Sequence, residues 1–138
     1  MRSDCPLNFG LEIFGDKWSL LIIRDLMFFG KRYYNEFLGS AESISTNILA
    51  ERLAMLEKEK IIKKEKDKSH KQKVLYSLTE KGIDLAPVII NIGLWSDKYA
   101  RQLNPQKDIL LGAARKNYLR GMNRLKKRLY EEHVKGRQ

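Results

Sequence analysis

The chain has 138 residues, of which 43% are hydrophobic and 32% charged, and its formal net charge at pH 7 is +10. These values are typical of one soluble globular domain with room for an appended element, and they exclude a disordered chain. The longest apolar run, near Trp18 to Ile23, ends at Arg24 and Asp25, so no membrane-spanning segment is expected. The first residues lack a secretory apolar region, which predicts a cytoplasmic protein.

Residues that would support catalysis or metal binding are scarce. Cys5 is the single cysteine, which excludes an internal disulfide, and His70 and His133 are the two histidines. The sequence has no recognisable Ser/His/Asp or Cys/His set and no glycine-rich phosphate loop. We therefore expect no enzyme activity, no metal site and no cofactor.

The positive charge is concentrated in two segments. Residues 61–82 hold seven Lys and Arg against three Asp and Glu, and residues 105–138 hold ten against three. Residues 1–60 are nearly balanced, with eight against nine. This asymmetry favours a polyanion as partner, although excess lysine can also serve solubility alone.

The first half of the chain predicts a series of helices. Pro6 suits the first turn of a helix over residues 5–14, which Gly15 ends. Asp16 can cap a second helix from Lys17 to about Phe29, which is apolar nearly all round and should lie at the centre of the domain. Residues 31–33 form a short extended link or an edge strand, and a brief helix spans 34–38.

The helix over residues 43–60 has the pattern of a recognition helix. Its apolar residues recur at three- and four-residue spacing, so they share one face: Ile44, Ile48, Leu49, Leu53 and Leu56. Either Ser43 or Ser45 can cap its amino end. About five residues connect it to the preceding helix, which is a helix-turn-helix length. Small and hydrogen-bonding side chains on the opposite face suit the major groove of DNA, or a solvated surface.

The pattern then changes to alternation, which predicts two strands over about 61–66 and 73–78. The polar segment between them has the composition of a hairpin turn. A hairpin in this position is the wing of a winged helix.

The remaining residues predict two further helices. One spans 79–102, capped by Thr79 and bent by Pro87. A final helix begins at Asn104-Pro105 and has an apolar seam with nearly heptad spacing: Leu111, Ala114, Tyr118, Met122, Leu125 and Leu129. We expect this helix to pack across a dimer or against its own domain; extra DNA contact is the second interpretation.

The predicted fold class is therefore mainly α with a small β-hairpin wing, that is, a winged helix-turn-helix with an added C-terminal helix. Residues 1–104 would form the DNA-binding domain, including the helix 79–102. Residues 105–138 would form the basic amphipathic C-terminal helix.

Several sequence blocks, in this order, resemble the HxlR-type branch of the bacterial winged-helix regulators, which are relatives of the MarR group. The similarity covers residues 5 to about 98. The blocks are Cys5-Pro6, Gly15-Asp16-Lys17-Trp18, Leu20-Leu21-Ile22, Lys31-Arg32, Tyr34-Asn35-Glu36-Phe37, Ile44-Ser45, Arg52-Leu53, Leu56-Glu57, Tyr76 to Gly82, and Pro87-Val88.

The resemblance implies a homodimeric DNA-binding transcription regulator, often a repressor, on a pseudo-palindromic operator. It also implies double-stranded DNA as partner and leaves a small-molecule effector open, with a pocket beneath Trp18, Leu21 and Trp95 as one location. The alternative function is a winged-helix module that binds protein without binding an operator.

The expected DNA contacts fall into two sets. On the recognition helix, Thr46, Asn47 and Arg52 are candidates for groove contacts; Ser45 either contacts phosphate or only caps the helix. Arg52 could instead pair with Glu36 or Glu51. The expected backbone contacts are Lys31, Arg32, Lys66, Lys68, His70, Lys71 and Lys73.

Cys5 is a candidate redox sensor. The partial positive charge at a helix amino end stabilises a thiolate and raises its reactivity, whereas the neighbouring Asp4 opposes this effect. Some members of the family use a cysteine here to sense oxidants or electrophiles, while a buried cysteine would be inert.

Overall fold

A computed structural model of the protein describes residues 2–70, 72–100 and 107–137. Helix α1 (Pro6–Phe14) is followed by α2 (Ser19–Phe28), α3 (Tyr34–Leu38) and α4 (Thr46–Lys58). A hairpin of β1 (Ile62–Lys66) and β2 (Val74–Leu78) comes next. The chain continues with α5 (Glu80–Ile83), α6 (Ala86–Tyr99), α7 (Lys107–Lys116), α8 (Tyr118–His133) and a short 3-10 helix, η1 (Lys135–Arg137). This order confirms the mainly helical winged helix-turn-helix.

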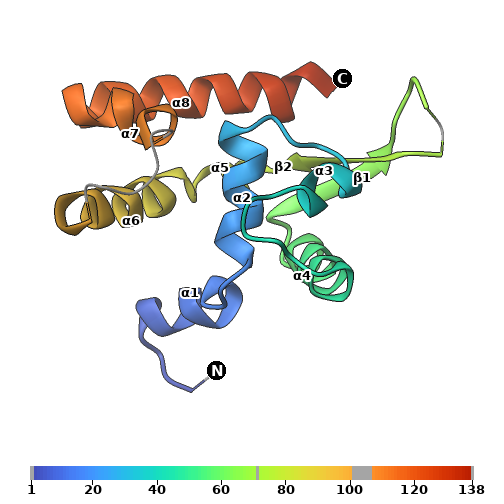
Figure 1. The fold of residues 1–138 in the computed structure, drawn as a ribbon, viewed down its shortest axis with the longest axis horizontal. Coiled ribbons are helices and arrows are strands. Elements are labelled where there is room, and N and C mark those ends of the chain that lie inside the picture. The colour runs from blue at the N-terminus through green and yellow to red at the C-terminus, as the bar shows by residue number, and fades with distance from the viewer. Residues whose placement is uncertain (1, 71, 101–106, 138) are drawn as a thin grey trace.

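Helix α2 lies at the middle of the molecule (Figure 1). Ile22, Ile23, Leu26 and Met27 are all at most 3% exposed, because the helix is covered on several sides. Burying each such side chain stabilises the fold by roughly 1.5–3 kcal/mol. Asp16 is not the N-cap residue, which is Trp18, but its Oδ2 accepts hydrogen bonds from the backbone N–H groups of Trp18 and Ser19 at 2.9 and 3.0 Å.

Helices α3 and α4 form the helix-turn-helix. Ser45, rather than Ser43, caps α4: its hydroxyl accepts from the N–H of Ile48 at 3.3 Å. Leu49, Leu53 and Leu56 face the core, as their spacing predicted. The hydroxyl of Tyr34 donates to the carbonyl oxygen of Thr46 at 2.9 Å, which ties α3 to the first turn of α4.

The hairpin is antiparallel and extends from the body of the domain as a wing (Figure 1). Its register pairs Ile62 with Leu78 at the buried base and Lys66 with Val74 towards the tip. The backbone N–H of Tyr76 also donates to the carbonyl oxygen of Arg32 at 2.8 Å. The link over 31–33 is therefore held along β2 by backbone contact, although it is not itself a strand.

The prediction of a single helix over 79–102 was wrong, because the chain forms two helices there, α5 and α6. Pro87 has no N–H to donate to the carbonyl of Ile83, so one continuous helix is disfavoured and Pro87 lies in the first turn of α6. Gly82 in α5 is required by close packing, since an added Cβ would lie 2.2 Å from the carbonyl oxygen of Ile61. The predicted helix end at Gln102 falls outside the described residues.

The prediction of a single C-terminal helix was also wrong, because the chain forms α7 and α8. Asn117 adopts an extended conformation and its side chain accepts from the N–H of Arg120 at 3.0 Å, so a new helix, α8, begins after it. The predicted cap at Asn104-Pro105 lies outside the described residues. The predicted seam is nevertheless the inner face: Leu111, Ala114, Met122 and Leu129 are buried in the same core cluster as α2 and α4.

Helix α8 is anchored to the winged helix of its own chain. His133 is 1% exposed, and its Nδ1 accepts from the backbone N–H of Leu78 at 3.0 Å. Arg128 donates to the carbonyl oxygen of Met27 at 3.1 Å. Burial lowers the pKa of His133 to about 4, and the positive charges of Arg32 and Arg128 lower it as well. A hydrogen bond with the backbone of Leu26 acts in the opposite direction and raises the pKa.

The buried histidine predicts an acid-sensitive fold. In the unfolded chain His133 titrates near 6.5, so above that pH it is neutral in both states and stability is complete. As the pH falls from 6.5 towards 4, the unfolded state gains a proton that the folded state resists. We expect the free energy of unfolding to fall over this window, by about 3 kcal/mol in total, in urea titrations.

The His133→Gln variant is the matched control, because it keeps an acceptor for Leu78 but cannot titrate. Its stability between pH 6.5 and 5 should change much less than that of the wild type. An equally steep loss in this variant would assign the acid sensitivity to other groups.

Candidate nucleic-acid interface

The amino end of α4 is an exposed polar surface. Ser45, Thr46 and Asn47 are all exposed, whereas the opposite face of the helix packs into the core. The hydroxyl of Ser45 is used by the cap, and no hydrogen bond of the Thr46 or Asn47 side chain is seen among the described residues. This end of the helix can therefore present donors and acceptors to a groove.

Arg52 lies one to two turns further along α4 and is held in ion pairs. Its guanidinium lies 2.5 Å from Glu51 Oε1 and 3.4 Å from Asp16 Oδ1. Glu51 is one of the two partners considered from the sequence, whereas Asp16 was not anticipated because it lies on the loop before α2. The side chain of Arg52 is 22% exposed and that of Glu51 is 69% exposed.

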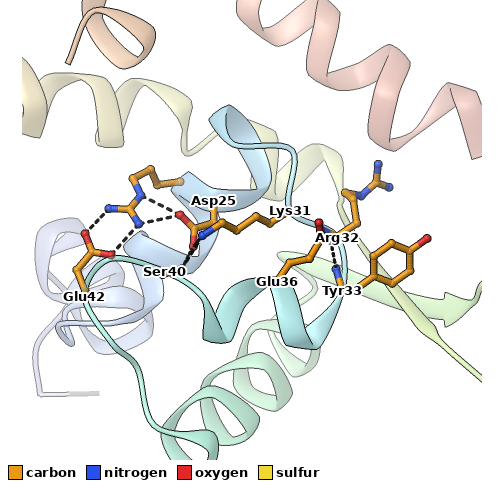
Figure 2. Close-up of polar contacts among 8 residues, drawn as sticks. Asp25, Lys31, Arg32, Tyr33, Glu36, Ser40 and Glu42 are labelled. Carbon is orange, nitrogen blue, oxygen red and sulfur yellow. Dashed lines mark hydrogen bonds and ion pairs between the residues drawn. The ribbon is translucent and has the colours of Figure 1, made fainter. Parts of the chain in front are cut away.

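Lys31 points into the protein rather than towards solvent. Its ammonium lies 2.9 Å from the Ser40 hydroxyl and 3.4 Å from the buried carboxylate of Asp25 (Figure 2). Arg24 bridges Asp25 and Glu42, 2.7 Å from each carboxylate. The bond from Arg24, the largest influence, lowers the pKa of Glu42. Lys31 thus joins the end of α2 to the turn between α3 and α4.

Arg32 fastens the wing to the helix-turn-helix. Its Nε donates to the carbonyl oxygen of Tyr76 and its Nη2 to the hydroxyl of Ser77, both at 2.7 Å. Burial lowers the pKa of Arg32 from its usual value, although the group stays charged at neutral pH. Two of the predicted phosphate contacts, Lys31 and Arg32, are therefore engaged inside the protein.

The wing itself presents exposed cations. Lys66, Lys68, His70 and Lys73 are exposed, and Lys71 lies outside the described residues. The Lys73 ammonium lies 5.2 Å from the centre of the Tyr33 ring. The turn is ordered by Asp67, which accepts hydrogen bonds from the Tyr33 hydroxyl and from the N–H of Ser69. These bonds lower the pKa of Asp67.

Sequence reasoning missed the residues that hold this interface in place, namely Asp25, Ser40, Glu42, Asp67 and Ser77. A lone acidic residue such as Asp25 in an apolar helix was the available signal, because a buried charge requires partners.

Cys5 immediately precedes α1, as expected from the sequence, and the structure shows that it is exposed. A predicted ligand pocket beneath Trp18 and Leu21 is only about 10 Å³ in volume, which holds about one water molecule. Trp95 lies on the surface, 67% exposed, and does not line it. No helix in the part of the chain that the structure describes is long and apolar enough to cross a membrane.

Residues 13–104 match the family model described as HxlR-like helix-turn-helix. The chain belongs to this family. The HTH-type transcriptional regulator YdeP of Bacillus subtilis is 37% identical over 112 residues, covering 81% of this chain and 83% of YdeP. YodB of Bacillus subtilis, also named an HTH-type transcriptional regulator, is 35% identical over 96 residues, covering 69% and 85%.

Solved structures agree with this assignment. The redox regulator HypR in its oxidised form is 34% identical with a TM-score of 0.60, covering 68% of this chain and 96% of HypR. The reduced form of YodB from B. subtilis is 28% identical with a TM-score of 0.57, covering 74% and 100%. The protein is thus a DNA-binding transcriptional regulator of the HxlR type, and the family match ends before α7.

The different placements of Arg32 and Lys68 predict different mutant behaviour. Arg32→Ala removes two charged hydrogen bonds to β2 and should lower the free energy of unfolding by roughly 2 kcal/mol or more. Lys68→Gln should change it by less than about 0.5 kcal/mol. If Lys68 contacts a phosphate, its variant should lower the slope of log K against log salt for duplex binding by about 0.9. Equal stability of the two variants in urea would contradict the structural role of Arg32 in holding β2 against the helix-turn-helix.

Proposed function

We propose that this HxlR-type regulator acts as a homodimeric repressor on a pseudo-palindromic operator, with Cys5 as its signal-sensing residue. The exposed polar amino end of α4, together with the exposed cations of the wing, supports this proposal. An α-helix enters the major groove, and flanking lysines neutralise phosphates. Thr46 and Asn47 read base edges, and Lys66, Lys68, Lys71 and Lys73, with His70, contact the backbone.

Arg52 can join the groove contacts at a small cost. Its pair with the exposed Glu51 is worth about 0–1 kcal/mol, so breaking this pair costs little. A bidentate contact of Arg52 with guanine would discriminate against other bases by about 1–3 kcal/mol. Lys31 and Arg32 act mainly by positioning the helix-turn-helix and the wing, since their charged groups already have partners.

Exposed apolar side chains on α1 and α6 support dimerisation. Leu7 and Leu11 on α1 are 69% and 52% exposed, and Trp95 and Tyr99 on α6 are both 67% exposed. Large apolar surfaces of this kind favour a protein partner, and a second copy would bury them symmetrically. The two α4 helices would then read half-sites about one helical turn apart, roughly 34–36 Å.

The position of Cys5 connects this surface to a redox signal. The thiol is exposed at the start of α1, next to the apolar residues proposed for the dimer. HypR is described as a redox regulator with oxidised and reduced forms, and YodB as having quinone-bound and diamide-treated forms. With one cysteine per chain, any disulfide of Cys5 must join it to Cys5 of a second copy or to a small thiol.

Operator reading by α4 is tested by fluorescence anisotropy, using DNA from upstream of the protein's own gene and a scrambled duplex. Asn47→Ala should reduce the preference for the upstream duplex by roughly 5- to 150-fold, since a base contact contributes about 1–3 kcal/mol. The salt slope should remain, because the phosphate contacts are retained. Lys58→Ala, at the other end of α4, is the control and should keep the preference.

Failure of the wild type to bind any duplex at low salt would reject this function and favour a protein partner. Equal binding to both duplexes would contradict sequence reading by α4 at this operator.

Sensing by Cys5 is tested with the thiol oxidant diamide, which accepts two electrons and two protons as two thiols form a disulfide. Oxidation, with or without added glutathione, should change the affinity for operator DNA by about tenfold or more, and dithiothreitol should reverse it. Cys5→Ser should bind like the reduced protein and ignore diamide. A response that persists in this variant would show that the thiol is not the sensor.

A further inference from the structure

The outer face of the C-terminal helices has a row of cations. This row, the α7–α8 basic stripe, consists of Lys116, Arg120, Arg124 and Lys127. All four side chains are exposed. At 100° per residue, Arg120, Arg124 and Lys127 lie opposite to Met122 and Leu129, which face the core. These three residues of the stripe therefore lie on the face of α8 that is turned away from the core.

These cations have no acidic partners among the residues that the structure describes. Other basic residues of the same helices do: Arg115 pairs with Asp97, Lys126 with Asp84, and Arg128 with Glu132. Lys116, Arg120 and Arg124 also line a surface hollow of about 180 Å³ together with Asn117 and Gly121, and no carboxylate lines it. These like charges repel one another and so destabilise the folded chain, and binding of an anionic partner would relieve the repulsion.

The stripe lies on the far side of the molecule from the recognition helix. Figure 1 shows α8 along one side and α4 at the opposite side, with α2 between them. A straight duplex held by α4 and the wing would not lie against the stripe. The stripe also lies outside the family match, which ends at residue 104.

We propose that the α7–α8 basic stripe is a second nucleic-acid surface, which binds the phosphate backbone of a duplex segment other than the one held by α4. Successive stripe residues on α8 rise by about 6 and 4.5 Å, and a duplex carries one charge per roughly 1.7 Å of its axis. Two of the four residues are arginines, whose planar guanidinium binds phosphate in a bidentate manner. Such contacts are independent of sequence, so the surface would let one regulator bridge two DNA segments.

The test is capture of a second duplex. A complex of the protein with an immobilised operator duplex is presented with a fluorescent duplex of unrelated sequence over a salt series. The stripe variant replaces four cations by glutamine: Lys116→Gln, Arg120→Gln, Arg124→Gln and Lys127→Gln. The control removes the same charge elsewhere: Lys17→Gln, Lys58→Gln, Lys60→Gln and Lys98→Gln. Circular dichroism checks that both variants fold.

We expect the wild type and the control to capture the second duplex. The stripe variant should lose capture by tenfold or more, and the slope of log K against log salt should fall by about 3 to 4. Binding of the first duplex should be unchanged. Absence of capture by the wild type, or equal loss in the control, would overturn the proposal. Equal weakening of the first duplex would also overturn it, by placing the stripe on the operator segment.

A second experiment does not depend on operator recognition. In a protein with the wing substitutions Lys66→Gln, Lys68→Gln and Lys73→Gln, the residual binding of free duplex should weaken, and its salt slope should fall by about 3 to 4, when the stripe substitutions are added. This result is expected even if the proposed operator function fails. Displacement of the duplex by poly-glutamate at equal charge concentration would instead identify the stripe as a site for acidic protein and overturn the nucleic-acid assignment.

Discussion

The carboxylate of Asp25 is 2% exposed, and the folded state must supply partners for its charge. Arg24, Lys31 and Ser40 all donate to it, and the backbone N–H of Lys31 donates to its carbonyl oxygen. Removing one partner of a buried ion pair typically costs 3–5 kcal/mol, so these positions are strongly coupled. The turn before α4 is thereby fixed against α2, and the direction of the recognition helix depends on it.

A second set of contacts extends this fixed frame to the wing and the C-terminus. Arg32 donates to β2, and the next residue of β2, Leu78, donates to His133 at the end of α8. Arg128, on α8, donates a hydrogen bond to the carbonyl oxygen of Met27 near the end of α2. The wing is therefore placed by contacts from both sides of the domain, and α8 acts as a brace whose attachment depends on a neutral histidine.

The protein's cations fall into two populations with different roles. Arg24, Lys31 and Arg32 are partly buried, have specific partners and position structural elements. Lys66, Lys68 and Lys73 of the wing and the α7–α8 basic stripe are exposed to solvent. Composition counts both populations equally, but only the second one attracts a polyanion over a distance of about a Debye length.

The helix-turn-helix, the hairpin and the inner face of the C-terminal helices could be predicted from the sequence, whereas the register of the hairpin came from the structure. The predicted features follow from local periodicity, from the cap residue Ser45, and from the alternation of apolar residues in the strand sequences. The breaks near Pro87 and at Asn117 were less visible, because a helix with one weak position can either bend or end. The choice depends on packing, such as the contact of Gly82 with the carbonyl of Ile61.

Long-range packing determines which charged residues face solvent, and this could not be predicted from the sequence. Arg52 meets Asp16 across 36 positions of sequence, and Arg32 reaches Tyr76 and Ser77 across 44 and 45. Lysine and arginine have the same local pattern whether they bind phosphate or a buried carbonyl, since their long side chains reach either environment. The partner is selected by long-range packing, which local sequence does not encode.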